Sequence, residues 1–104
     1  MSSASERLPA HTLHCVVRAP LDGEAMLLAV AAAVRGDCVL LLQDGVRAAV
    51  AGAVVLPPGV RGYVLMADLI VRGLDPQQVD GFVAIDAAGF VALAAAARRQ
   101  VCWA

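Results

Sequence analysis

The sequence predicts an α/β fold, a single three-layer domain with a mainly parallel sheet of about five strands. Short β-rich runs alternate with helix-like segments along the chain, and short connections join them. The clearest strand, Cys38–Leu42, is apolar at every position, as expected for a strand that is buried on both faces of a parallel sheet. Alternation of this kind places helices on both faces of one sheet.

The chain begins with a polar segment, residues 1–11, which has no periodicity and is expected to be a flexible N-terminal extension. The domain proper then spans residues 12–104, and its first strand is the β-rich run Thr12–Val17. Asp22 suits the N-cap of a helix that reaches about Arg35, where the following glycine stops it.

The middle of the chain holds two more strands, each followed by a short helix. The strand Cys38–Leu42 leads into a helix over Val46–Val50 that ends at a glycine, and the two prolines after it predict a loop. Gly62–Met66 is the third strand, and Ala67–Val71 is a short helical turn that Gly73 ends.

The last part of the chain predicts a loop, a strand, a helix and a final strand. Asp75–Gly81 has the composition of a loop, and Phe82–Ile85 is the fourth strand. Asp86 can cap a final helix that reaches Arg98-Arg99, whose positive charges suit the negative end of the helix dipole. Val101–Trp103 is the last short strand.

The composition predicts a surface that another protein chain covers. Hydrophobic residues make up 61% of the 104 residues and charged residues only 16%, against roughly 25% charged in an ordinary domain. A domain of this size cannot bury so much apolar surface within itself, so part of the surface is expected to be a contact patch.

Charge and cysteine content exclude other classes of partner. The net charge is -1 and the arginines are scattered, which argues against direct nucleic-acid binding. The most apolar helical segment is about half as long as a membrane span, so no membrane contact is expected. An odd number of cysteines without a signal peptide indicates reduced thiols and a cytoplasmic protein.

Polar residues that follow the predicted strands are the natural candidates for a functional site, because ligands gather beyond the carboxyl ends of parallel strands. They are Arg18, the turn Gln43-Asp44-Gly45, Asp68 and Asp86. Without a histidine, a serine nucleophile or a glycine-rich phosphate loop, they form no catalytic or cofactor-binding set. Helix capping and turn formation account for most of the aspartates.

Histidine and cysteine give no metal site, and the thiols are expected to pack. His14 and Cys15 point to opposite faces of a strand, no CxxC or HxxxH spacing is present, and His14 is interpreted as structural. Cys15 and Cys38 lie in apolar strand runs, where burial makes a thiol inert. Cys102 lies beside Trp103 near the C-terminus, so Cys102 and Cys38 are only weak persulfide candidates.

Four segments carry a resemblance to a known family. The segment Gly36–Gly52 (GDCVLLLQDGVRAAVAG) contains a strand, the motif QDGV and a helix, and Tyr63–Leu74 reads YVLMADLIVRGL. Leu13–Pro20 reads LHCVVRAP, with alanine where the motif has serine, and Ile85–Trp103 has ID, FV and a closing tryptophan. Taken in chain order, the four segments resemble the DsrH/TusB family of sulfur-relay subunits over about residues 12–103.

The resemblance implies a DsrE-like fold and specific partners. Such subunits assemble with homologous DsrE/TusD-type and DsrF/TusC-type subunits into a heterohexamer, which passes persulfide sulfur to a TusE/DsrC-like acceptor. In the TusBCD-like branch the sulfur reaches the wobble uridine of tRNA. The family signature supplies the candidate interface residues Gln43, Asp44, Gly45, Asp68, Arg72, Gly73, Asp86 and Trp103.

The resemblance also implies a non-catalytic role. Some relatives carry a cysteine in the first helix at a position that is about Ala29 here, and the principal persulfide cysteine belongs to the DsrE/TusD-type subunit. Three alternatives stay open: a DsrH-like subunit of a DsrEFH sulfur-oxidation complex, a sulfurtransferase that uses Cys102 or Cys38, and a flavodoxin-like flavin or nucleotide binder. The last lacks the phosphate loop that it would need.

Overall fold

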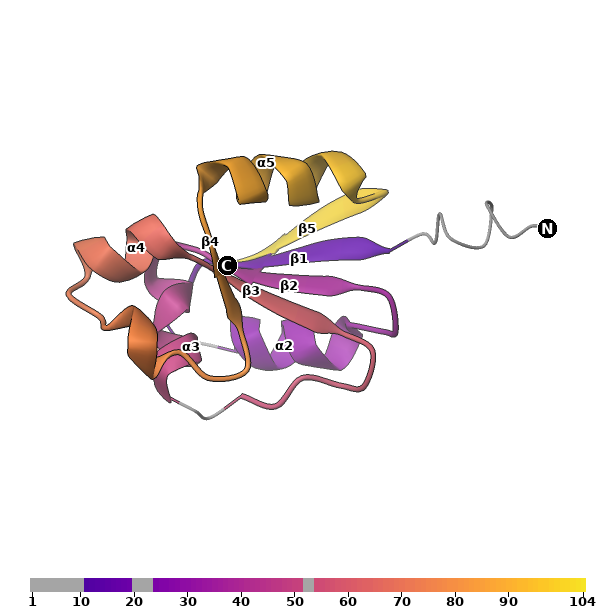
Figure 1. The fold of residues 1–104 in the computed structure, drawn as a ribbon. Helices are drawn as coiled ribbons and strands as arrows, with labels where there is room; N and C mark the ends of the chain where they lie inside the picture. The colour runs from indigo at the N-terminus through magenta and orange to yellow at the C-terminus, as the bar shows by residue number, and fades with distance from the viewer. Residues whose placement is uncertain (1–10, 20–23, 52–53) are drawn as a thin grey trace.

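The computed structural model describes residues 11–19, 24–51 and 54–104 and shows a five-stranded sheet between helices (Figure 1). The strands are β1 (Thr12–Val16), β2 (Cys38–Leu41), β3 (Arg61–Leu65), β4 (Val83–Ile85) and β5 (Arg99–Trp103). The helices are α2 (Ala25–Ala32), α3 (Arg47–Ala51), α4 (Met66–Val71) and α5 (Ala87–Ala96), with the single turns η2 (Gln43–Val46) and η3 (Pro76–Gln78) of tighter helix.

The strand order is β4-β3-β2-β1-β5, and every neighbouring pair is parallel. The β2 strand therefore lies at the centre of the sheet, and Val39, Leu40 and Leu41 are completely buried. This confirms the α/β prediction and the interpretation of the continuous apolar run as a strand covered on both faces.

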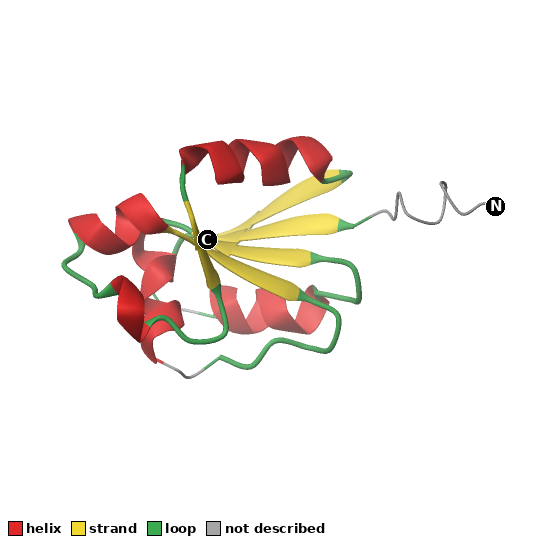
Figure 2. Cartoon of the chain, viewed as in Figure 1, coloured by secondary structure: helices red, strands yellow, loops and turns green. Residues whose placement is uncertain are grey.

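Each face of the sheet has its own apolar core. Val39 and Leu41 point to the face that α2 and α3 cover, whereas Leu13 and Leu40 point to the face that α5 covers with Phe90 and its neighbours. Figure 2 shows α5 on one side of the strands and α2 on the other. Burial of a leucine side chain contributes about 1.5–3 kcal/mol, so these two cores hold the three layers together.

The first helix is shorter than predicted. It ends at Ala32, not near Arg35, because the extended backbone after it turns the Val34 N–H toward the Asp37 carboxylate, at 3.1 Å. The expected N-cap, Asp22, lies outside the described residues, and so do residues 1–10 of the expected N-terminal extension. Gly36 still marks the turn, with φ +94°.

The last helix was predicted too long at its carboxyl end. It ends at Ala96, because Ala97 is extended and the Arg98 N–H donates to the carbonyl of His11 at 3.1 Å. Arg99 then pairs with Thr12 and begins β5, two residues earlier than expected. Arg98 therefore lies between α5 and β5, and Arg99 lies in the edge strand, so the prediction that the helix reaches these arginines was wrong.

Smaller differences lie between the strands. The QDG turn is η2, and α3 follows it at once, starting one residue later than the predicted helix. The predicted loop Asp75–Gly81 contains η3, with the Asp75 side chain as its N-cap. The glycine expected to end α3 lies outside the described residues. Among the described residues, the helices are all too short or too polar to cross a membrane.

Candidate functional site

The QDG turn lies where β2 ends and packs against the end of β1. The Leu42 N–H donates to the Val16 carbonyl at 3.0 Å, and Gln43 adopts a left-handed conformation with φ +51°. A Cβ atom at Gly45 would overlap the Val16 carbonyl. The glycine of the signature is therefore required by the close approach of two backbones, not by a ligand.

Asp44, Asp68 and Arg72 join this turn to α4. The Gln43 N–H donates to Asp68 Oδ2 at 2.7 Å, and Arg72 Nε donates to Asp44 Oδ1 at 2.8 Å. Arg72 also donates to the Asp68 carbonyl at 3.3 Å and lies 3.7 Å from its carboxylate. The hydrogen bond from the Arg72 guanidinium holds the pKa of Asp44 below its ordinary value. We call Gln43, Asp44, Asp68 and Arg72 the signature cluster.

Gly73 and Asp86 serve the ends of helices. Gly73, with φ +70°, closes α4, and the Leu74 N–H after it donates back to the Leu69 carbonyl at 2.9 Å. Asp86 Oδ1 accepts from the Gly89 N–H at 2.8 Å and caps α5. The capping interpretation of Asp86 is thus confirmed, whereas Asp44 and Asp68 connect a turn to a helix and do not cap one.

The side chains of the signature cluster hold backbone and one another in place. Asp44, Asp68 and Arg72 each have a partner within the cluster, and Arg18, beyond β1, is exposed. In the described ranges, no three His, Cys, Asp or Glu side chains come together in a way that could hold a metal ion. The arrangement therefore fixes the shape of the surface at the carboxyl edge of the sheet.

Trp103, the last of the candidate interface residues, takes part in a buried polar network. The Trp103 indole N–H donates to His14 Nδ1 at 3.1 Å, and His14 Nε2 lies 3.0 Å from Asp37 Oδ2. Since an indole nitrogen can only donate, His14 Nδ1 is an acceptor, and Nε2 carries the proton and donates it to Asp37. His14 is 4% exposed. The geometry agrees with the structural interpretation of this histidine.

Asp37 anchors this network. Its carboxylate also accepts from the Thr12 N–H at 2.9 Å and the Val34 N–H at 3.1 Å. Burial opposes its ionisation, but these donors and His14 outweigh burial and hold the pKa of Asp37 below its ordinary value. Sequence reasoning missed Asp37 because an aspartate after a glycine is typical of a turn.

The three thiols lie in different environments. Cys15 is buried, Cys38 is half-buried and Cys102 is exposed. Burial raises the pKa of Cys15 and of Cys38. Cys38 begins β2 and packs beside Leu13, Cys15 and Leu40, as expected, and it also lines an open pocket at this end of the sheet. Ala29 is completely buried in α2, so a side chain at that position contacts the core.

Large apolar side chains are exposed on several elements, as the composition predicted. Leu27 on α2 is 71% exposed and Val71 on α4 is 78% exposed. Since α2 and α5 cover opposite faces of the sheet, the exposed apolar positions occur on both sides of the molecule. The set comprises Leu27, Leu28, Val34, Val55, Ile70, Val71, Val83 and Val91.

Fold and site together define a small parallel α/β protein with an ordered signature turn and exposed apolar helices. A known structure shares this fold: the solution structure of protein Tm0979 from Thermotoga maritima matches with a TM-score of 0.67 at 21% sequence identity. The match covers 81% of this chain and 91% of that chain.

Sequence comparison shows the family. The family model described as DsrH like protein matches residues 18–100. Protein TusB from Shigella flexneri is 41% identical over 98 residues, which cover 89% of this chain and 98% of the relative. The TusB proteins of Escherichia coli and Escherichia fergusonii match with the same identity and coverage. The chain therefore belongs to the DsrH/TusB family, and this membership supports a role as a sulfur-relay subunit.

Proposed function

We propose that this chain is a non-catalytic structural subunit of a TusBCD-like sulfur-relay complex, which passes persulfide sulfur toward thiolation of the tRNA wobble uridine. The observation that carries the proposal is the exposed apolar surface on α2, α4 and α5, in a chain whose relatives are TusB proteins. The relatives' name favours the TusBCD-like branch over the DsrEFH branch.

The chemistry of the chain supports a structural role. Persulfide chemistry needs an accessible thiolate, but burial raises the pKa of Cys15 and Cys38. The charges of the signature cluster pair with one another and do not surround a thiol. A partner subunit of the DsrE/TusD type would therefore supply the nucleophile, while this chain shapes and stabilises the complex.

Two homologous subunits fit the distribution of the apolar surface. The positions on α2 and α5 lie on opposite faces of the sheet, and those on α4 lie beside the signature cluster. Contact with a DsrE/TusD-type and a DsrF/TusC-type subunit in a cytoplasmic heterohexamer would cover such surfaces. The TusE/DsrC-like acceptor would act on that complex.

Co-expression with the two partner subunits tests this proposal. We expect one stable assembly that contains all three chains, as measured by size-exclusion chromatography and native mass. Leu27→Glu and Val71→Glu should weaken the assembly, because each places a charge in the proposed interface with a partner subunit. The matched change Gln78→Glu, at an exposed polar position, should not weaken it. If the chain stays monomeric beside both partners, the proposal is wrong.

Cys102 supports a second candidate function, a sulfurtransferase in its own right, because its thiol is exposed on β5. Incubation with a persulfide donor, followed by intact mass, distinguishes the two functions. A structural subunit keeps its mass, whereas a transferase gains one sulfur atom that Cys102→Ala abolishes.

A further inference from the structure

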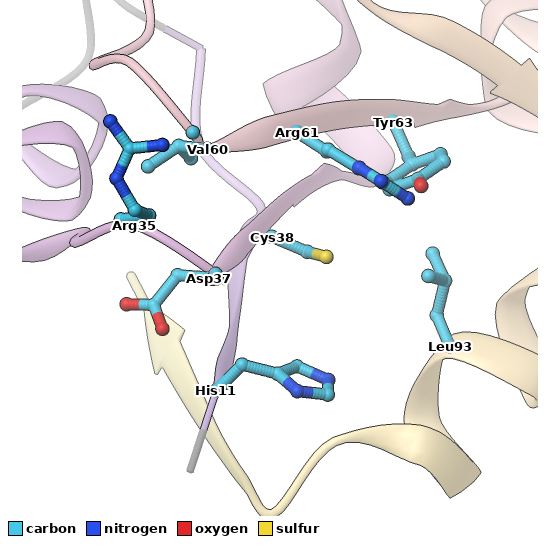
Figure 3. A pocket seen from close by; sticks show the side chains of 10 residues that line it. His11, Arg35, Asp37, Cys38, Val60, Arg61, Tyr63 and Leu93 are labelled. Carbon is cyan, nitrogen blue, oxygen red and sulfur yellow. The ribbon is translucent and has the colours of Figure 1, made fainter. Parts of the chain in front are cut away.

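An open pocket lies at the amino-terminal edge of the sheet, at the end opposite the signature cluster. It has a volume of about 760 Å³, and the starts of β2 and β3 and the helix α5 line it. Figure 3 shows the Cys38 thiol pointing into a space that Arg61, Tyr63, Leu93 and His11 surround. A cavity of this size holds a small molecule of the size of a tripeptide.

The free polar groups of this pocket favour an anion. Arg35 and Arg61 both line it, and within the described part of the chain neither guanidinium has an ion-pair partner. Asp37 is the one carboxylate in the lining, but it points away from Cys38 and is bound by Thr12 and His14 (Figure 3). The remaining charges are therefore positive, and carboxylate groups of a ligand match them.

Arg35 is held in place beside the pocket. Its side chain lies over Gly59, where a Cβ atom would meet Arg35 Cγ at 2.7 Å. The backbone below is fixed as well, since the Gly36 N–H donates to the Gly59 carbonyl at 3.0 Å. The glycine thus makes room for one of the two cations that line the pocket.

The thiol of Cys38 is accessible from this pocket. It is half-buried: it packs beside the core of Leu13, Cys15 and Leu40, and its sulfur points toward the pocket (Figure 3). Burial raises the pKa of Cys38, Arg61 opposes this rise, and Asp37 adds to it. Because the thiolate is the reactive form, the reaction rate should increase as the pH rises.

We propose that this pocket binds small anionic disulfides and that Cys38 exchanges with them to form a mixed disulfide. The Cys38 sulfur, after loss of its proton, attacks one sulfur of the bound disulfide. The sulfur–sulfur bond of the ligand breaks, a new bond joins Cys38 to one half, and the other half leaves as a thiolate that takes up the proton. The ligand is itself the oxidant, so no other reactant is needed.

The charge of the disulfide provides the test. The full-length chain is treated with oxidised glutathione, which is anionic, hydroxyethyl disulfide, which is neutral, and cystamine, which is cationic. Modification of Cys38 is followed in the tryptic peptide 36–47, or 36–61 where Arg47 is replaced, and each rate is divided by the rate in the urea-unfolded chain. We expect the folded chain to favour the anionic over the cationic reagent by roughly threefold or more, and added salt to reduce this preference.

Two variants locate the effect. Arg61→Gln should lower the ratio of the rate with oxidised glutathione to the rate with cystamine, and this ratio cancels the rise in the Cys38 pKa that loss of Arg61 causes. Arg47→Gln, which replaces an exposed arginine on α3, should leave the ratio unchanged. Equal relative rates with all three reagents, or an Arg61→Gln variant that keeps the full preference, would overturn the proposal. The outcome does not depend on partner subunits, so it is independent of the proposed function.

Discussion

Asp37 is the residue on which the amino-terminal edge of the sheet depends. Its buried carboxylate accepts hydrogen bonds from two backbone N–H groups, those of Thr12 and Val34, and from the imidazole of His14. Through His14 it also orients Trp103. One side chain thus ties the start of β1, the end of α2 and the last strand together.

Asp37→Asn should destabilise the chain by about 2–3 kcal/mol, because an amide offers one acceptor oxygen and turns its NH₂ group toward a donor. Urea unfolding followed by Trp103 fluorescence measures this loss. Asp75→Asn, at an exposed cap, should change the free energy of unfolding by only about 0.5 kcal/mol. Equal costs for the two variants would show that the network does not stabilise the fold.

The ionisation of Asp37 makes this contribution dependent on pH. Its pKa is lower in the folded chain than in the unfolded chain, so the stabilisation is fully present above the unfolded value, about pH 4, and is lost as the pH falls through the folded value. The difference in unfolding free energy between the wild type and Asp37→Asn should therefore narrow below about pH 4. A difference that widens in acid would contradict this account.

Gly45 is required because a larger side chain does not fit there, and this steric requirement can be distinguished from a requirement for positive φ. Gly45→Ala should cost about 2 kcal/mol or more, because the new methyl group meets the Val16 carbonyl. Gly81→Ala is the control, since Gly81 has φ +80° but open space around it, and should cost about 1 kcal/mol. Thermal unfolding of the two variants shows which substitution causes the larger loss of stability. A smaller loss for Gly45→Ala would argue against the close approach of β1 and η2.

At the scale of elements, Arg72 connects α4 to η2. Arg72, at the end of α4, donates to Asp44 in η2, and the Gln43 N–H in η2 donates in return to Asp68 in α4. We expect a double-mutant cycle of Arg72→Gln and Asp44→Asn to show coupling: the two single losses should add to more than the loss of the double variant. The coupling should shrink at high salt, because the pair is exposed to solvent. Strictly additive losses would show that the pair does not link the elements.

Strands could be predicted from the sequence better than the ends of helices. The run Cys38–Leu42 was recognised because a buried parallel strand is apolar at every position. The ends of α2 and α5 were misplaced because partners far along the chain decide them: Asp37 takes up the Val34 N–H, and His11 accepts from Arg98. Local capping signals do not contain this information.

The candidate site was predictable where its residues are close in sequence or belong to the family signature. The structure brings Gln43, Asp44, Asp68 and Arg72 together. The turn and Asp68 were expected beyond the carboxyl ends of parallel strands, and Arg72 entered only through the family signature. The bond between His14 and Trp103 joins residues 89 positions apart, and no spacing rule connects them. The pocket beside Cys38 likewise arises only when β2, β3 and α5 meet.

At the scale of the whole molecule, the chain combines a hydrogen-bonded buried network around Asp37 with large apolar side chains on its surface. The composition predicted the excess of apolar surface, and the fold distributes it over α2, α4 and α5. A protein whose signature turn is internally paired, and whose helices expose leucine and valine, is suited to assembly. Its contribution to sulfur transfer would then be architectural.

A cysteine-free chain tests this central claim most directly. Sulfur transfer to the acceptor is measured in the complex reconstituted with the two partner subunits, with the wild-type chain, with Cys15→Ala/Cys38→Ala/Cys102→Ala, and without the chain. If the chain is a structural subunit, the wild-type and cysteine-free chains should support equal sulfur transfer, and transfer should be lost without the chain. If the cysteine-free chain assembles normally but fails to support transfer, this chain carries sulfur itself and the proposed function is wrong.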